Sequence, residues 1–472
     1  MPDRILLPLI VACALFMENL DSTVLATALP AIAADFGESP IHLKLALTSY
    51  LLAIAVFLPA SGWLADRYGA RSIFLLAITT FTVGSILCGL STSIGALVAA
   101  RVIQGIGGAM MVPVGRLVIL KSVPKRELVG SLAWLTVPAL IGPVIGPPVG
   151  GFITTYFEWR WIFWINIPVG VLGLVLAALF IPNLRGDTPT RFDGLGFVLS
   201  AFGLAAFMSG STALGLGLLP RSLTLSLLVG GAVLLFVYVL HGRRAASPIL
   251  DLSLLRNRTF AMSMIGALLF RLGVGATPFL LPLLLQVGFG MSPFKSGSIT
   301  FAAAVGAIAM KFAAPPILRR FGFRNVLTWN ALIAGVFVAL PAIFTPQTPI
   351  AVILVLLLVG GFFRSLQFTS VNALSYADVP PERMSRATSL ASVAQQLSLS
   401  VGISVGAITL ETTTRFSAGV IEAGSFAPAF LVIGVFSMLA MVPFLLLSRD
   451  AGDEMSGRQP APDPVTAMRE RS

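Results

Sequence analysis

The sequence is poor in the residues from which most enzyme active sites are built. It contains two histidines and two cysteines among 472 residues, and both Cys13 and Cys88 lie inside apolar runs. Isolated thiols in hydrophobic segments are typical of small buried side chains, so no disulfide framework is expected. His42 and His241 lie near the ends of different apolar runs, which leaves little from which to build a metal site or a catalytic triad. We therefore expect no bound metal and no enzymatic activity.

Charged residues are scarce as well. They make up 11% of the chain, against about 25% in a typical soluble protein. Hydrophobic residues account for 56%, and the mean hydropathy is +0.93. The 45 glycines and 31 prolines are spread through the apolar runs, as membrane helices tolerate. The composition predicts an all-α polytopic membrane protein.

The apolar runs predict fourteen membrane spans, since a span needs roughly 20 apolar residues. The first run is too long for a cleaved signal peptide, and we interpret it as a retained span. The predicted spans cover residues 6–33, 45–66, 73–92, 96–120, 130–154, 161–182, 194–215, 222–241, 259–288, 296–317, 325–345, 350–374, 388–411 and 427–448.

The distribution of basic residues predicts the orientation. Of 31 lysines and arginines, 21 fall in one set of connections together with both termini, five in the other set and five within spans. Positive residues concentrate on the cytoplasmic side of membrane proteins, so both termini are expected to be cytoplasmic. The net charge of +11 is explained by this topology, and no nucleic-acid partner is expected.

The first span contains two carboxylates, Glu18 and Asp21. They are three residues apart, so they project from neighbouring faces of a helix. No other predicted span carries an acid in its middle. A carboxylate inside the membrane is costly, which makes both residues candidates for a functional site.

A glycine- and charge-rich loop follows the second span. A tight turn with alternating charges there can form a cytoplasmic latch that breaks and remakes between conformations, although a solvated turn with orienting arginines is the alternative. The candidate latch residues are Gly62, Asp66, Arg67, Gly69 and Arg71.

The same pattern, Arg-aromatic-Gly-x-Arg, recurs within residues 317–324 after the tenth span and suggests two related halves. The expected parts are residues 1–184 (an N-terminal six-helix half), 185–258 (an inserted helix pair), 259–448 (a C-terminal six-helix half) and 449–472 (a disordered cytoplasmic tail).

Span four places Arg101, Gln104 and Gly108 on one helical stripe. Packing alone would explain the glycine but not an arginine inside the membrane, so we favour a functional role. Span five carries small residues at intervals of four, with prolines between them, which permits close packing and kinking. A generic kinked packing helix is the alternative. Its motif residues are Gly142, Pro143, Gly146, Pro147, Gly150 and Gly151.

These motifs resemble those of the major facilitator superfamily. The loop after span two is similar to the family's signature loop, with Ala70 where a second basic residue is common. Span four resembles the proton-linked R-x-x-Q-G motif, and span five resembles the motif that separates antiporters from other members. Residues 20–30 are similar to the span-one motif of the fourteen-span drug:proton antiporters of the EmrB/QacA type, and residues 160–170 and 378–383 fit that branch. Glu18 departs from it, because glutamine or an apolar residue is commoner there.

The resemblance implies a major facilitator fold of two six-helix halves with an inserted two-helix hairpin. It implies a proton-driven exporter of amphipathic small molecules, working by alternating access in a bacterial inner membrane. No cofactor is expected beyond the proton-motive force. The expected partners are the substrate, protons and lipid. The chain is expected to be monomeric, and an adaptor protein is a further partner that the sequence leaves open.

The candidate site roles follow from charge. We expect Asp21 to be the coupling acid, Glu18 a second acceptor or substrate contact, and Arg101 the partner that modulates Asp21. Gln104 would orient by hydrogen bonding and is also a candidate substrate contact.

Arg271 and Arg364 are central in their spans and are expected to contact substrate, with structural ion pairing or carbonyl capping as the alternative. Together with Arg101 they give three bases against two acids. Neutral, zwitterionic or anionic compounds are therefore at least as well matched as cations. Arg116 and Lys311 lie nearer the cytoplasmic ends and are expected to snorkel toward water.

Two rival functions remain open. Uptake or facilitated diffusion of a metabolite would use the same fold, and the span-five motif argues against it. A membrane-embedded enzyme or sensor lacks a catalytic cluster or a signalling domain in this sequence. ATP-driven transport is disfavoured because no P-loop pattern is present.

Overall fold

A computed structural model describes residues 3–37, 40–186, 191–216, 219–416 and 422–456, and within these ranges every regular element is helical. The principal helices are α1 (Asp3–Phe36), α2 (Pro40–Phe57), α3 (Ser61–Tyr68), α4 (Ala70–Gly89), α5 (Ile94–Ser122), α6 (Leu128–Tyr156), α7 (Trp161–Trp164), α8 (Asn166–Phe180), α9 (Gly194–Leu216), α10 (Arg221–Gly242), α11 (Arg258–Gly275), α12 (Thr277–Leu283), α13 (Pro293–Ala339), α14 (Ile350–Leu374), α15 (Met384–Phe416), α16 (Ala427–Leu439), α17 (Met441–Leu445) and α18 (Asp453–Ser456).

The long apolar runs form helices because a backbone in hydrocarbon must satisfy its own polar groups. Several helices begin where a short polar side chain accepts a hydrogen bond from a free backbone amide of the first turn. Asn257 accepts from the amide of Phe260 at 3.0 Å at the start of α11, and Ser292 accepts from the amide of Lys295 at 3.3 Å at the start of α13. Local chemistry thus sets the helix starts.

Among the described residues, twelve helices are long and apolar enough to cross a bilayer. One of them, Phe294–Ile343, has 50 residues, more than twice what a single span needs. Helix α6, with 29 residues, is not among the twelve. The all-helical membrane architecture expected from the sequence is confirmed, whereas the number of fourteen spans stays a prediction.

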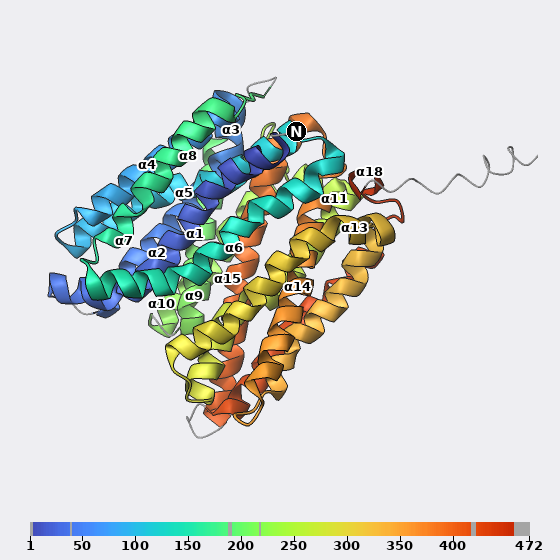
Figure 1. The fold of residues 1–472 in the computed structure, drawn as a ribbon. Helices are drawn as coiled ribbons and strands as arrows, with labels where there is room; N and C mark the ends of the chain where they lie inside the picture. Colours follow the sequence, from blue (N-terminus) through green and yellow to red (C-terminus); the bar gives the residue numbers. More distant parts are fainter. Residues whose placement is uncertain (1–2, 38–39, 187–190, 217–218, 417–421, 457–472) are drawn as a thin grey trace, which may run out of the picture.

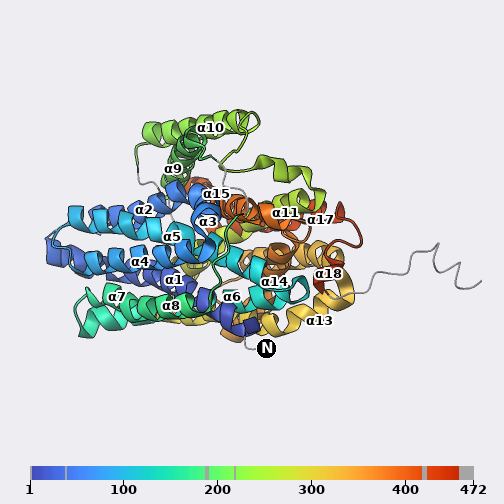
Figure 2. The same ribbon diagram turned by 90° about the horizontal axis from the view of Figure 1, so that it is seen from above.

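The helices fall into two groups and a pair. Helices α1–α8 pack on one another, and so do α11–α17 (Figure 1). Between the two groups in sequence, α9 and α10 pack together and contact the bundle through α2 and α15. Figure 2 shows this pair outside the bundle on one side. The helix pair therefore touches one helix of each group from outside the bundle.

The two copies of the repeated sequence pattern make the same backbone turn. Gly69 separates α3 from α4 with a φ of 95°, and Gly322 interrupts α13 with a φ of 73°. Both values lie in the region that favours glycine, so the glycine in each copy permits a turn between two helical stretches. At Gly69 a Cβ atom would also lie 2.1 Å from the side-chain oxygen of Asn183.

The packing of α9 on α10 yields a prediction with an adjacent control. A Cβ atom on Gly231 would lie 2.4 Å from the backbone nitrogen of Phe207 in α9, whereas one on Gly230 would meet nothing within 4 Å. We expect Gly231→Ala to destabilise the protein by roughly 1–3 kcal/mol through overpacking. Gly230→Ala should be neutral or slightly stabilising. Melting temperatures of the purified variants check this, and equal behaviour of the two would contradict the packing.

Candidate functional site

Four polar side chains meet inside the first group of helices. Asp21 comes from α1, Arg101 and Gln104 from α5, and Asn166 from the first position of α8. Their exposed fractions are 2%, 0%, 0% and 1% in that order. Because these side chains are buried, each needs polar partners inside the protein, and most of their hydrogen bonds are to one another.

Asp21 accepts hydrogen bonds from three of these neighbours. One terminal nitrogen of Arg101 lies 2.5 Å from its Oδ2. The amide of Gln104 donates to Oδ1 at 2.9 Å, and the amide of Asn166 donates to the same oxygen at 3.0 Å. The Gln104 carbonyl oxygen accepts from Arg101 at 2.7 Å, which closes the ring of contacts. A carboxylate with one cation and two amide donors is well satisfied as an anion.

Arg101 has further contacts on its other side. Its Nε donates to the backbone oxygen of Ala46 at 3.3 Å, and its guanidinium lies 4.2 Å from the centre of the Tyr50 ring. The second terminal nitrogen of Arg101 and the hydroxyl of Tyr50 are buried and have no hydrogen-bond partner within the described residues. These two groups could therefore form new hydrogen bonds if Arg101 changed its position relative to Asp21.

Asn166 is the member of the network that the sequence did not predict. Its amide also donates to the hydroxyl of Ser85 at 3.0 Å, and that hydroxyl donates to the backbone oxygen of Phe163 at 2.8 Å. The aromatic residues around Asn166 are typical of a membrane boundary, so the sequence pattern predicts no polar site there. The available signal was an amide within an apolar span, a residue type that is costly there without a partner.

Glu18 lies one helical turn from Asp21 on α1 but is not part of this network. Its Oε2 is buried and has no hydrogen-bond partner in the ranges that the structure describes. The structure therefore distinguishes the two acids: Asp21 pairs with Arg101, whereas no ion pair to Glu18 is found among the described residues.

The glycines of span five pack α6 against α1 at the level of the two acids. A Cβ atom on Gly142 would lie 3.1 Å from the backbone nitrogen of Leu20, and one on Gly146 would lie 2.1 Å from the hydroxyl of Thr23. A Cβ atom on Gly151 would meet nothing within 4 Å. Gly150 is buried in the same helix, and the side chains of Pro143 and Pro147 lie outside the described part.

The basic residues predicted to contact substrate lie in the second group of helices. Arg271 of α11 is 3% exposed and donates to the side-chain oxygen of Asn372 on α14 at 2.7 Å. Arg364 is partly buried near the middle of α14. Neither joins the Asp21 network in the described hydrogen bonds, so the structure divides the predicted site residues between the two groups.

The expectation that Arg116 and Lys311 snorkel toward water is wrong. They are 7% and 8% exposed, because both side chains point into the protein. Arg116 donates to the Tyr376 hydroxyl at 3.3 Å, and Lys311 donates to the Thr369 hydroxyl at 2.7 Å. Hydroxyl partners in the interior satisfy these donors in place of water.

The candidate latch joins the two groups of helices. The hydroxyl of Ser385, at the start of α15, donates to the Asp66 carboxylate, which also lies 3.8 Å from the Lys121 ammonium. The hydroxyls of Ser61 and Ser389 lie 2.9 Å apart. A Cβ atom on Gly62 would lie 2.7 Å from the backbone oxygen of Ser385, so only glycine permits this approach.

The remaining latch residues act within the first group. Arg71 donates to the backbone oxygen of Ala178 in α8, and the amide of Ala70 donates to the oxygen of Leu184 at 2.8 Å. Gly69 forms the turn between α3 and α4, and Arg67 is exposed. Asp66 and Gly62 are thus the residues of this set that meet the other group.

A second set of contacts reaches α15 from the segment that follows α10. Asp251 accepts hydrogen bonds from the hydroxyl and amide of Ser253 and from Arg383 at 2.7 Å. Burial works to raise the pKa of Asp251, but the hydrogen bonds from Ser253 and the guanidinium of Arg383 outweigh it and hold the pKa below its ordinary value. The start of α15 therefore carries contacts from two other parts of the chain.

The Asp21 network combines one carboxylate with one guanidinium and two amides in the interior of the first group. Within the described residues no group of three His, Cys, Asp or Glu side chains is placed to hold a metal ion. The chemistry available here is proton exchange and charge recognition.

Comparison with known proteins identifies relatives along nearly the whole chain. A family profile described as Major Facilitator Superfamily matches residues 11–403, and a second match covers residues 263–470. A protein named "Putative multidrug resistance protein MdtD" from Salmonella heidelberg (strain SL476) is 38% identical over 457 residues, which cover 94% of this chain and 95% of the relative. The protein of the same name from Escherichia coli O17:K52:H18 (strain UMN026 / ExPEC) is 40% identical over 404 residues, covering 85% of each.

Two solved structures share the fold. The crystal structure of the human organic anion transporter MFSD10 (TETRAN) superposes with a TM-score of 0.66 at 15% identity, covering 94% of this chain and 100% of that one. The proton:xylose symporter XylE, bound to a bromodeoxyglucose, also gives 0.66 at 16% identity, covering 96% and 98%. At these identities the likeness concerns the fold alone.

The buried pair yields a stability prediction. Arg101→Leu leaves the Asp21 carboxylate buried without its cation, and loss of one partner of such a pair costs about 3–5 kcal/mol. We expect the double variant Asp21→Asn/Arg101→Leu to be more stable than Arg101→Leu alone, because the orphaned charge is gone. Melting temperatures of both single variants and the double variant measure this coupling. Arg319→Leu, at an exposed arginine, is the control. Strictly additive effects would contradict the pairing.

Proposed function

Because this chain belongs to the Major Facilitator Superfamily, it is a multi-pass membrane transporter and not an enzyme, and we propose that it is a proton-driven exporter of amphipathic small molecules. The observation that carries this proposal is the buried network around Asp21, in which one ionisable carboxylate is held by one arginine and two amides. A transporter without ion coupling has no need of an ionisable pair at this depth.

In the proposed mechanism, Asp21 alternates between two states. Paired with Arg101 it is ionised, as its contacts in this structure favour. A conformational change that withdraws Arg101 would raise the affinity of Asp21 for a proton. Gln104 hydrogen-bonds to both Arg101 and Asp21 and so holds the pair together. Glu18 lies one helical turn from Asp21, its buried Oε2 has no hydrogen-bond partner in the described residues, and it serves as a second proton acceptor or as a substrate contact.

Export is favoured over uptake by the packing of α6 on α1. Gly142 and Gly146 belong to the motif that resembles the antiporter motif of the family, and they bring α6 against the helix that carries both acids. A movement of α6 would therefore displace α1 near Asp21. The relatives named as multidrug resistance proteins support the same direction of transport.

We further propose fourteen spans with both termini in the cytoplasm of a bacterial cell and the chain in its inner membrane. The helix Phe294–Ile343 turns at Gly322 and supplies two spans, and α6 supplies one more. The parts are the two six-helix halves 1–184 and 259–448 and the inserted hairpin 185–258. The segment after residue 448 begins with contacts to the first half, since Glu454 of α18 pairs with Lys125 at 3.0 Å.

The proposed cycle is alternating access, with the latch closed in the present conformation. In the proposed orientation, Asp66–Ser385, Ser61–Ser389 and Arg116–Tyr376 all join the halves at the cytoplasmic end. These contacts must break for substrate to enter from the cytoplasm. The rival function, uptake or facilitated diffusion, would use the same fold and is distinguished by the direction of coupled flux.

The coupling proposal predicts the behaviour of inside-out vesicles. When an amphipathic compound that is a substrate is added to energised vesicles, wild-type protein should release protons from the lumen. Asp21→Asn should abolish this release, because an amide cannot exchange a proton. Fluorescence of a pH-gradient dye measures the release, with Arg319→Gln and empty vesicles as controls. Normal coupled transport after Asp21→Asn and Glu18→Gln together would refute the assignment of the coupling site.

The latch proposal predicts a reversible lock. With Cys13 and Cys88 replaced by serine, the pair Ser61→Cys and Ser389→Cys should form a disulfide, because the two hydroxyls lie 2.9 Å apart. Oxidation should then stop transport, and a reducing agent should restore it. Each single cysteine variant is the control and should be insensitive to oxidation. Undiminished transport by the cross-linked protein would show that these contacts do not open.

A further inference from the structure

Four buried or partly buried bases, one each on α5, α11, α13 and α14, have no acidic partner among the described hydrogen bonds. Counting along α14, Arg364, Phe368 and Asn372 recur every four residues and so lie on one face. The side-chain oxygen of Asn372 accepts a hydrogen bond from Arg271, and the hydroxyl of Thr369, three residues earlier on α14, accepts one from Lys311. Tyr376, in the turn just beyond the end of α14, accepts a hydrogen bond from Arg116. We call Arg116, Arg271, Lys311 and Arg364 the basic row.

The basic row is not neutralised by the protein. Helices α11, α13 and α14 contain no Asp or Glu, and in the described part of the chain no ion pair joins a member of the row to an acid. The Nε of Arg271 is buried without a hydrogen-bond partner in these ranges. Arg116 is close enough to Arg271 for their charges to repel each other. Buried cations held only by amides and hydroxyls have a large unmet demand for negative charge.

One member of the row, Arg364, is not fully enclosed by packing. Arg364 is partly exposed at the middle of α14, and no hydrogen bond in the described residues joins it to another group. An arginine at this depth cannot face lipid at low cost, which favours an orientation of its guanidinium toward the interior between the helices. A ligand there would reach Arg364 directly.

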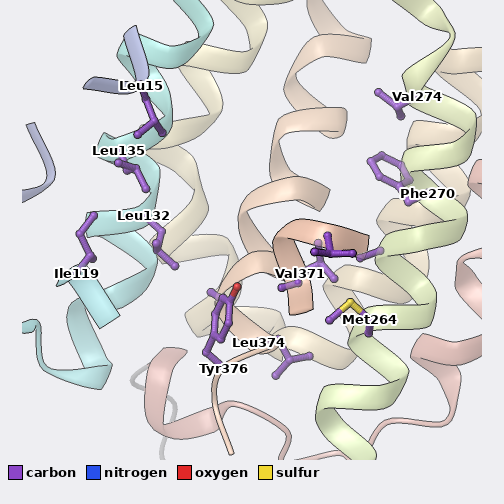
Figure 3. Close-up of a cluster of buried hydrophobic side chains, with 14 of the residues drawn as sticks. Leu15, Ile119, Leu132, Leu135, Met264, Phe270, Val274, Val371, Leu374 and Tyr376 are labelled. Carbon is purple, nitrogen blue, oxygen red and sulfur yellow. The ribbon is translucent and has the colours of Figure 1, made fainter. Parts of the chain in front are cut away.

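The surroundings of the row are apolar. Figure 3 shows Phe270, Met264 and Val274 of α11, and Val371 and Leu374 of α14, in one cluster with side chains of the other group. Leu15, Leu132 and Leu135 face them from α1 and α6, and Tyr376 lies between the two sets in this view. The Phe368 ring also lies 5.7 Å from the guanidinium of Arg271. Positive charge beside an apolar cluster suits a ligand with one anionic group and a hydrophobic body.

We propose that Arg271, Lys311 and Arg364 recognise the charge of the substrate, and that the substrate is an amphipathic anion carrying a carboxylate, sulfonate or phosphate. This inference rests on the proposed function, because it names the substrate class of the same transporter. It also assigns different tasks to the two halves. Asp21 in the first half is already balanced by Arg101 and exchanges protons, while the unbalanced bases of the second half bind the anion.

The test is a binding measurement on the full-length protein in nanodiscs of zwitterionic lipid, with no proton gradient. The two probes share an aromatic body and differ in charge: anilinonaphthalenesulfonate is an anion, and phenylnaphthylamine is neutral. We expect saturable binding of the sulfonate to be tighter than that of the amine. Arg271→Gln should weaken sulfonate binding about tenfold or more, as loss of a charge-assisted hydrogen bond predicts, and leave the amine unchanged. Arg319→Gln is the control at an exposed arginine.

Three results would overturn the proposal. They are equal affinity of the wild type for both probes, no saturable binding of the sulfonate, or an equal loss of affinity for both probes in Arg271→Gln. If Arg271→Gln fails to fold, Arg364→Gln takes its place, because that residue makes no described hydrogen bond. The same titration on Asp21→Asn separates this inference from the proposed function, because this variant should lose coupled transport but keep its selective binding of the sulfonate. Selective sulfonate binding without coupled transport in the wild type would refute proton-driven export and leave the anion site standing.

Discussion

A carboxylate placed in hydrocarbon must find a counter-charge or give up its own charge, and the first group of helices is arranged around that constraint. Asp21 of α1 finds its cation on α5 and an amide on α8, so three helices are tied together at one depth. The glycines of α6 then bring a fourth helix against α1 at the same level. In the proposed mechanism, a movement of these helices that separates Arg101 from Asp21 couples conformation to protons.

The second group of helices treats charge differently. Its buried bases Arg271 and Lys311 are held by an amide and a hydroxyl, and no ion pair in the described residues joins either of them to an acid. The two groups meet at the end where Ser385 of α15 donates to Asp66 of α3. The proposed proton site in one group and the proposed anion site in the other would then be linked by contacts that form in one conformation and break in the next.

Much of this arrangement was accessible from the sequence, and the reasons for the gaps are physical. The helical membrane architecture followed from long apolar runs, because helices are the simplest way to satisfy a backbone in lipid. Asp21, Arg101 and Gln104 stood out because charged and amide side chains are costly in such runs, and the structure does bring them together. Asn166 was missed because aromatic neighbours made its segment read as a membrane boundary.

Arg116 and Lys311 were misjudged because distance from a span end says nothing about which way a side chain points. The links from Asp66 to Ser385 and from Arg383 to Asp251 could not be foreseen either. They join residues 319 and 132 positions apart, and no local pattern encodes such contacts.

The most direct test of the central claim, that Asp21 exchanges a proton as substrate binds, is the proton balance of binding itself. Titrating the anionic probe into purified protein in weakly buffered solution, at a pH where proton and probe compete, should release protons in proportion to the probe bound. Glu18→Gln should reveal how much of that release belongs to the neighbouring acid. The account predicts that Asp21→Asn still binds the probe but releases no proton. Unchanged release from Asp21→Asn would place the coupling elsewhere and contradict it.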